Sequence, residues 1–251
     1  MIGLCLVSCA LTLGGGDVRD LPRITAPEQI ALAADAAAGR LAAGEPGGFE
    51  LQLACRDLVL TPSARREALR RVRPETRRFL SGCIDAGLQL RSLTAPEARL
   101  PRWRIVTPPR AAALRALLVR AQSGVGWSYL GAIMLVETRM GRIRGASSAG
   151  ARGPMQFLPA TWRRYGRGSI ESYPDSIRAA ASLLRANGAP LQMTRALFAY
   201  NHDLRYVRAV QTYARLMRSH AWAFAAFRDW QVLYRLRSGS VQLVEGYDRS
   251  G

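Results

Sequence analysis

The segment from Leu130 to Met140, Leu-Gly-Ala-Ile-Met-Leu-Val-Glu-Thr-Arg-Met, is apolar over most of its length and predicts a helix that Gly141 stops. It contains Glu137, the only carboxylate between Glu97 and Glu171. A helical repeat places this acid on the face that packs inward. Its neighbours at helical spacing are all apolar: Leu130, Ile133, Met134 and Met140.

An acid on an apolar helix face predicts a carboxyl group with unusual proton affinity. Burial favours the protonated form and raises the pKa, as in acids that donate a proton to a glycosidic oxygen. A buried carboxylate paired with one of the many arginines would produce the same pattern. From this helix alone, both interpretations of Glu137 stay open.

Two later segments change the balance between these interpretations. One runs from Ser147 to Trp162 and contains Gly-Pro-Met-Gln at 153–156, and the other contains Ala-Tyr-Asn at 199–201. With Glu137-Thr138, they resemble the lytic murein transglycosylases of bacteria, in their Glu-Ser/Thr, Gly-Leu-Met-Gln and Ala-Tyr-Asn motifs. The motifs occur in the family's order over roughly residues 100 to 220, which is more specific than any one motif.

The match has departures, and they bear on the subfamily. Pro154 replaces the usual Leu, Thr138 replaces the Ser of the best-known members, and His202 follows Asn201 where Ala-Gly is common. The Glu-Thr pair and the Asn-His continuation are more similar to the membrane-bound and actinobacterial branches than to the large soluble periplasmic enzymes.

The resemblance implies a mainly α-helical, lysozyme-like domain that cleaves the MurNAc-GlcNAc β-1,4 bond of peptidoglycan and leaves 1,6-anhydro ends. Most glycosidases use two carboxylates, whereas this family uses one Glu as acid and then as base. The substrate's acetamido group stabilises the positive centre. Peptidoglycan glycan strands are then the partner, and no cofactor is expected.

Carried over by motif, Glu137 is the catalytic acid and base, and five residues contact or orient the substrate. Gln156 hydrogen-bonds near the scissile linkage, Ser147 contacts the acetamido group, and Met155 forms part of the groove wall. Tyr200 and Asn201 orient Glu137 or tune its proton affinity. Without the motifs, Met155 and Tyr200 would be interpreted as packing residues.

Two other functions remain open. A hydrolytic, lysozyme-like muramidase would need a second carboxylate at the site, for which Glu171, Asp175 and Asp203 are candidates. A non-catalytic, arginine-rich lipoprotein could instead bind the wall as a scaffold. His202 lacks partners at metal-ligand spacing, and no metal site is expected.

The charge balance favours an anionic partner. The 251 residues include 36 basic and 18 acidic ones, for a net charge of +18, and every basic residue other than the two histidines is Arg. Such a field concentrates a protein on anionic polymers. The arginines are scattered and no nucleic-acid-binding motif is present, so wall or membrane-surface attraction is favoured over nucleic acid.

Residues 1–16 form an apolar signal or lipoprotein-like segment, too short to span a bilayer. Leu6-Val7-Ser8-Cys9 resembles a lipobox, which predicts lipidation of Cys9; an uncleaved or ordinarily cleaved export signal is the alternative. We expect an exported protein of the cell envelope, on the extracellular or periplasmic side. In that compartment Cys55 and Cys83 should form a disulfide, with two buried thiols as the alternative.

The remaining chain divides into three predicted regions: a helical region of unknown role at 17–99, the transglycosylase domain at 100–220, and an aromatic segment with a β-hairpin at 221–251. Gly44–Gly48 predicts a turn or linker, and Gln231–Leu236 and Val241–Glu245 predict the hairpin strands. Helices are expected at 26–43, 62–72, 74–86, 111–121, 173–187 and 204–217.

Overall fold

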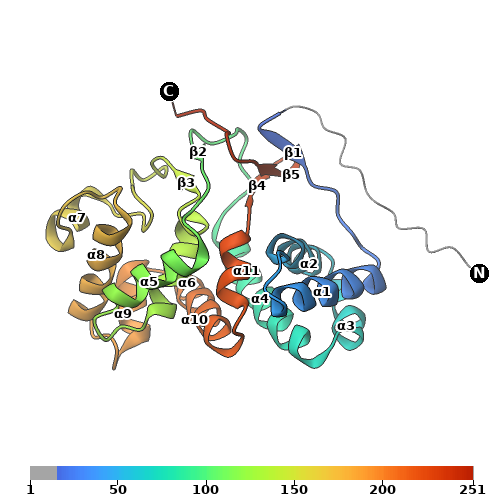
Figure 1. Ribbon diagram of the computed structural model, residues 1–251. Helices are drawn as coiled ribbons and strands as arrows, with labels where there is room; N and C mark the ends of the chain where they lie inside the picture. Colours follow the sequence, from blue (N-terminus) through green and yellow to red (C-terminus); the bar gives the residue numbers. More distant parts are fainter. Residues whose placement is uncertain (1–15, 251) are drawn as a thin grey trace, which may run out of the picture.

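The computed structural model describes residues 16–250, and Cys5 and Cys9 lie outside this range. The described chain is mainly helical, with a small antiparallel sheet and a second short strand pair (Figure 1). The helices are α1 (Pro27–Ala42), α2 (Gly48–Leu60), α3 (Pro62–Arg71), α4 (Pro74–Leu93), α5 (Ala111–Ala121), α6 (Trp127–Thr138), α7 (Pro159–Tyr165), α8 (Tyr173–Ala186), α9 (Met193–Tyr200), α10 (Leu204–Ser219) and α11 (Ala223–Asp229). The strands are β1 (Val18–Asp20), β2 (Arg104–Ile105), β3 (Ile143–Arg144), β4 (Val232–Leu236) and β5 (Gly239–Leu243).

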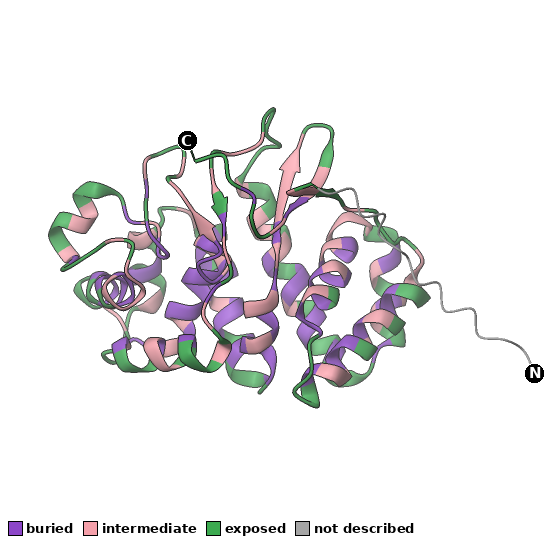
Figure 2. Cartoon of the chain, turned by 45° about the horizontal axis from the view of Figure 1, so that its top comes forward, coloured by how far each residue is buried: buried purple, intermediate pink, exposed green. Residues whose placement is uncertain are grey.

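Helix α10 is the element around which the others are arranged. It packs against α4 on one side and α6 on the other, between the α1–α4 group and the α5–α9 group (Figure 1). Gly82 permits the close approach of α4, because a Cβ there would lie 3.1 Å from Cδ2 of Leu216. One buried apolar core extends from Ile30 to Trp230 through both groups (Figure 2). The region 17–99 is therefore packed into the same core as the rest.

Local signals explain most helix boundaries. Proline occupies the first turn of α1, α3, α4, α7 and α8, where a missing N–H costs nothing. Asp203 caps α10 by accepting a hydrogen bond from the Arg205 N–H at 2.7 Å. The six expected helices are all present, although α4 extends to Leu93.

The expected linker at Gly44–Gly48 is wrong at its carboxyl end. Gly48 begins α2, where a Cβ would lie 2.4 Å from the Ala226 carbonyl oxygen of α11. Glycine is needed there for close packing of two helices. The pattern of small residues does not distinguish such a contact from a flexible turn.

The predicted β-hairpin is confirmed as β4 and β5, which pair antiparallel from Val232 opposite Leu243 to Leu236 opposite Gly239. The sequence did not predict β1, which adds a third strand by pairing Val18 with Leu243. The aromatic residues before the hairpin are buried core residues: Trp222, Phe224, Phe227 and Trp230.

Cys55 of α2 and Cys83 of α4 are joined by a disulfide, with sulfurs 2.12 Å and Cα atoms 6.1 Å apart. The predicted pairing is therefore confirmed in the structure. Among residues 16–250, no helix has the length and apolarity that crossing a bilayer requires.

Thiol titration tests directly whether the Cys55–Cys83 disulfide is present. In denaturant without reductant, neither Cys55 nor Cys83 should react with a thiol reagent, and both should react after reduction. Removing the cross-link frees the unfolded chain, so reduction should lower the free energy of unfolding by about 2–4 kcal/mol. The Cys83→Ser variant, measured by thiol titration with and without reductant, should expose Cys55 alone. Reaction of both thiols before reduction would contradict the bond.

Candidate active site

Glu137 lies in the last turn of α6, is partly buried, and lines a cavity of about 610 Å³. The acid is thus directed into a cavity, as its helix position predicts. Three parts of the chain form the walls. They are α2 and α4 of the amino-terminal region, the α6 and α9–α10 segments around Glu137, and the carboxyl-terminal strands β4 and β5.

Burial and a hydrogen bond from Tyr206 set the proton affinity of this acid. The Tyr206 hydroxyl of α10 donates to Glu137 Oε1 at 2.7 Å. Burial raises the pKa of Glu137 from 4.5 to about 7, and the Tyr206 hydrogen bond opposes this rise by favouring the carboxylate. Burial and the nearby Glu137 hold the pKa of Tyr206 well above its usual range, so the hydroxyl remains a donor.

The structure therefore corrects the partner assigned to Glu137. Tyr200 was expected in the orienting role, and Tyr206 was only part of the helix expected at 204–217. The Tyr200 hydroxyl instead donates to the Met155 carbonyl at 2.5 Å, and its ring stacks on that of Tyr206 with centroids 6.4 Å apart. Tyr200 thus contacts Tyr206 and forms no hydrogen bond with Glu137. The signal available in the sequence was Tyr206 itself, a tyrosine six residues after Tyr200 of the Ala-Tyr-Asn motif.

The end of α6 has an unusual backbone. Arg139, Met140 and Gly141 have consecutive positive φ angles of 52°, 61° and 85°. The helix consequently ends at Thr138, earlier than the expected stop at Gly141. This conformation costs free energy at residues other than glycine, and such strain is common at functional sites.

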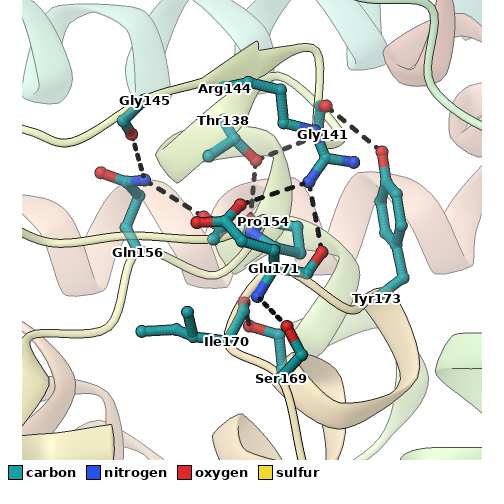
Figure 3. A network of polar contacts seen from close by, with 12 residues as sticks. Thr138, Gly141, Arg144, Gly145, Pro154, Gln156, Ser169, Ile170, Glu171 and Tyr173 are labelled. Carbon is teal, nitrogen blue, oxygen red and sulfur yellow. Dashed lines mark hydrogen bonds and ion pairs between the residues drawn. The ribbon is translucent and has the colours of Figure 1, made fainter.

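Thr138 holds this strained end in place (Figure 3). Its buried hydroxyl donates to the Pro154 carbonyl at 2.7 Å and accepts from the Gly141 N–H at 3.0 Å. Gly153 packs so closely that a Cβ would lie 2.0 Å from the Ile170 carbonyl oxygen. The Glu-Thr and Gly-Pro-Met-Gln segments are therefore physically joined next to the acid.

Two predicted substrate-binding residues lie in this loop and not in the lining of the cavity. The Gln156 amide nitrogen donates to the Gly153 carbonyl at 3.1 Å and lies 3.5 Å from that of Gly145 (Figure 3). The Ser147 hydroxyl accepts from the Ala151 N–H at 3.1 Å. Both side chains shape the loop, and their contacts with substrate stay predictions.

The prediction that Met155 forms part of the groove wall is wrong. Met155 has 0 % relative exposure and belongs to the apolar core, so it supports the loop from inside and forms no groove wall. Asn201, in contrast, is exposed and lines the Glu137 cavity. Its position after α9 leaves its amide available to a ligand.

Of the three candidate second carboxylates, only Asp203 lines the cavity with Glu137. Hydrogen bonds from the Arg205 side chain and backbone hold the pKa of Asp203 at about 2, so between about pH 2 and 7 Asp203 is ionised while Glu137 is protonated. Glu171 is 3.8 Å from Arg144, which also lies over the Tyr173 ring (Figure 3). Asp175 pairs with Arg178.

Arginines of the cavity are functional candidates that the sequence analysis missed. Five of them line it: Arg56, Arg91, Arg139, Arg205 and Arg235. They come from positions 56 to 235, so no local motif marks them as a group. Burial lowers the pKa of Arg139, which follows Glu137 by two residues.

Comparison of the chain with protein families, curated proteins and solved structures found no match. Within residues 16–250, no group of three or more His, Cys, Asp or Glu side chains is placed to hold a metal ion. The functional argument therefore depends on the geometry around Glu137 and on the sequence motifs.

With Glu137 as the expected catalytic acid, replacing Tyr206 by Phe should shift the alkaline limb of the pH–rate profile of peptidoglycan cleavage to higher pH. The lost hydroxyl no longer stabilises the Glu137 carboxylate, so the pKa of Glu137 rises above its value of about 7. Turnover should also fall about tenfold, because the carboxyl group loses its orienting donor. Rates measured from pH 4 to 9 test both effects.

Tyr213→Phe is the matched control for this substitution. Tyr213 lines the same cavity, and its hydroxyl does not bond to Glu137. The control should leave the alkaline limb in place. If the alkaline limb of the Tyr206→Phe variant stays where it is in the wild type, Tyr206 does not affect the pKa of Glu137.

Proposed function

We propose that the chain is a peptidoglycan lytic transglycosylase whose residues 100–220 form a lysozyme-like domain. The observation that carries the proposal is Glu137, an acid with a pKa of about 7 that lines a cavity and accepts a hydrogen bond from Tyr206. A group with that pKa can both give and accept a proton near neutral pH. The junction of the Glu-Thr and Gly-Pro-Met-Gln segments beside it supports the same function.

In this proposal, protonated Glu137 donates its proton to the glycosidic oxygen as the bond to the muramyl anomeric carbon breaks. The substrate's acetamido group stabilises the positive centre. The Glu137 carboxylate then takes the proton of the muramyl 6-hydroxyl, whose oxygen bonds to the anomeric carbon and closes the 1,6-anhydro ring. Tyr206 stabilises the intermediate carboxylate, and Tyr200 fixes Tyr206 by stacking.

Asp203 favours a second candidate, a hydrolytic muramidase. An ionised carboxylate and a protonated one in the same cavity are the pair that a two-carboxylate glycosidase needs. Against this role, Asp203 already caps α10 and binds the Arg205 guanidinium. These contacts account for its low pKa without catalysis, so we favour the single-acid route.

The products and the amide variants distinguish the two candidates. Asp203→Asn keeps the helix cap, because Asn caps as well as Asp does, and should lower turnover by less than about tenfold. Glu171→Gln and Asp175→Asn, whose side chains do not line the cavity, are matched controls with smaller effects. Mass spectrometry of digested peptidoglycan should show 1,6-anhydro-MurNAc ends. Products with ordinary reducing ends, together with a loss of nearly all turnover in the Asp203→Asn variant, would instead establish the hydrolase.

The proposed place of action is the cell envelope. The Cys55–Cys83 bond fits an oxidising compartment, and the charge of +18 fits an anionic wall. Lipid anchoring at Cys9 remains a proposal. A non-catalytic scaffold would sediment with peptidoglycan in a salt-sensitive way and release no fragments.

A further inference from the structure

Two of the five arginines in the Glu137 cavity have a carboxylate partner and three do not. Arg205 pairs with Asp203, and the Nε atom of Arg56 lies 3.1 Å from Asp57. Within residues 16–250, no carboxylate lies within 4.0 Å of the remaining guanidinium groups: Arg91, Arg139 and Arg235.

These three arginines come from separate parts of the fold; backbone carbonyls hold the side chains of Arg139 and Arg235, and Arg91 is exposed at the cavity. Arg139 Nη1 donates to Leu135 at 2.8 Å. Arg235 of β4 donates from Nη1 to the Arg91 carbonyl at 3.2 Å and from Nη2 to Thr94. The carbonyls fix the side chains without neutralising their charge.

Assembling cations in a partly buried cavity is unfavourable without a counter-charge. Burial lowers the pKa of Arg139 and of Arg235, and repulsion from Arg91 lowers that of Arg235 further. The lining residues include two acids: Glu137, whose pKa of about 7 leaves it partly protonated near neutral pH, and Asp203, which Arg205 already binds. An anionic ligand in the cavity would supply the counter-charge that no carboxylate of residues 16–250 places within 4.0 Å of these three groups.

We propose that Arg91, Arg139 and Arg235 form a carboxylate-binding subsite beside Glu137. Guanidinium groups bind carboxylates by paired hydrogen bonds, and their charge remains over the working pH range. This inference rests on the proposed function. The carboxylate then belongs to the substituent of muramic acid, either the lactyl group itself or the stem peptide that extends from it.

The subsite gives the amino-terminal helices and the β-hairpin a direct part in substrate choice. Arg91 comes from α4 and Arg235 from β4, opposite the helix that carries Glu137. A muramyl residue would be oriented by its own charge. A neutral chitin chain of the same length lacks that charge and should bind less tightly.

Binding can be measured in the Glu137→Gln background, in which the probes are not consumed. Calorimetry would use three tetrasaccharides: alternating GlcNAc-MurNAc with stem peptides, the same glycan with stems removed, and chitotetraose. Arg91→Gln and Arg139→Gln should each lower the affinity for the carboxylate-bearing probes about fivefold, and the double variant should lower it about twentyfold or more. Chitotetraose affinity should change by less than about twofold.

Arg185→Gln is the matched control, because Arg185 is exposed on α8 and does not line the cavity. It should change no affinity, and unfolding midpoints should show that all variants fold. The lactyl carboxyl is an amide in the stem-bearing probe, so a loss confined to the stem-free probe assigns the lactyl carboxylate and a loss confined to the stem-bearing probe assigns a carboxylate of the peptide. Equal losses for both muramyl probes show that the subsite accepts either carboxylate. Equal binding of all three probes, or unchanged affinity in the double variant, would overturn the subsite.

Cleavage assays separate the subsite from the function on which it rests. If the wild-type chain releases no fragments while the arginine variants still lose affinity, the transglycosylase proposal fails and the carboxylate subsite stands. If fragments appear while the variants bind normally, only the subsite fails.

Discussion

Replacing Glu137 by Gln should lower peptidoglycan turnover by about three orders of magnitude or more while the affinity for glycan persists. Glutamine keeps the size and hydrogen-bonding shape of the side chain but carries no transferable proton. The Tyr206 hydroxyl can still donate to the amide oxygen, as it does to Oε1 at 2.7 Å. The loss should therefore appear in kcat and leave KM nearly unchanged.

Release of soluble muropeptides from purified peptidoglycan measures this effect, with calorimetry of a bound glycan as the second readout. Glu171→Gln is the matched control, because it makes the same exchange at an acid that does not line the cavity. A Glu137→Gln protein that retains a tenth or more of wild-type turnover would remove Glu137 from the acid and base role.

The same substitution should change how stability depends on pH. Burial raises the pKa of Glu137 from 4.5 to about 7, so the folded state holds this proton more tightly than the unfolded state. This stabilising contribution is complete below the unfolded pKa and is lost as pH rises through the folded pKa. Above neutral pH, the folded protein carries an unfavourably buried carboxylate.

Relative to wild type, the Glu137→Gln variant should therefore gain free energy of unfolding as pH rises from about 4 to 8, by about 3 kcal/mol. Urea unfolding of both proteins across this range measures the difference. Asp203, with a pKa of about 2, contributes in the opposite sense and only at lower pH, and it is common to both proteins. A difference that stays constant with pH would mean that Glu137 is as well solvated as an ordinary surface acid.

Helix positions were largely predictable because their signals are local. Proline in the first turn, the Asp203 cap and the apolar repeat of α10 each act within a few residues. The disulfide followed from the number of cysteines once export was assumed. Helices α2, α7, α9 and α11 were not expected. For α2 the reason is that the Gly44–Gly48 segment resembles a turn or linker until its contact with α11 is known.

For the site, the sequence by itself determined which acid faces inward, because helix periodicity fixes the face on which Glu137 lies. The sequence could not determine what surrounds that acid. Tyr206 as hydrogen-bond donor, Met155 as core and Asp203 as a wall of the cavity all depend on how α10 packs against α6.

Only the tertiary structure brings Arg91, Arg139 and Arg235 to one cavity, from positions separated by up to 144 residues. Charge acts through space, so three scattered arginines carry no pattern along the chain until α4, α6 and β4 meet around Glu137. Secondary structure follows from interactions between near neighbours, and the sequence determines it directly. The pKa of the acid and the charge of its surroundings arise from burial and long-range packing, which only the folded chain decides.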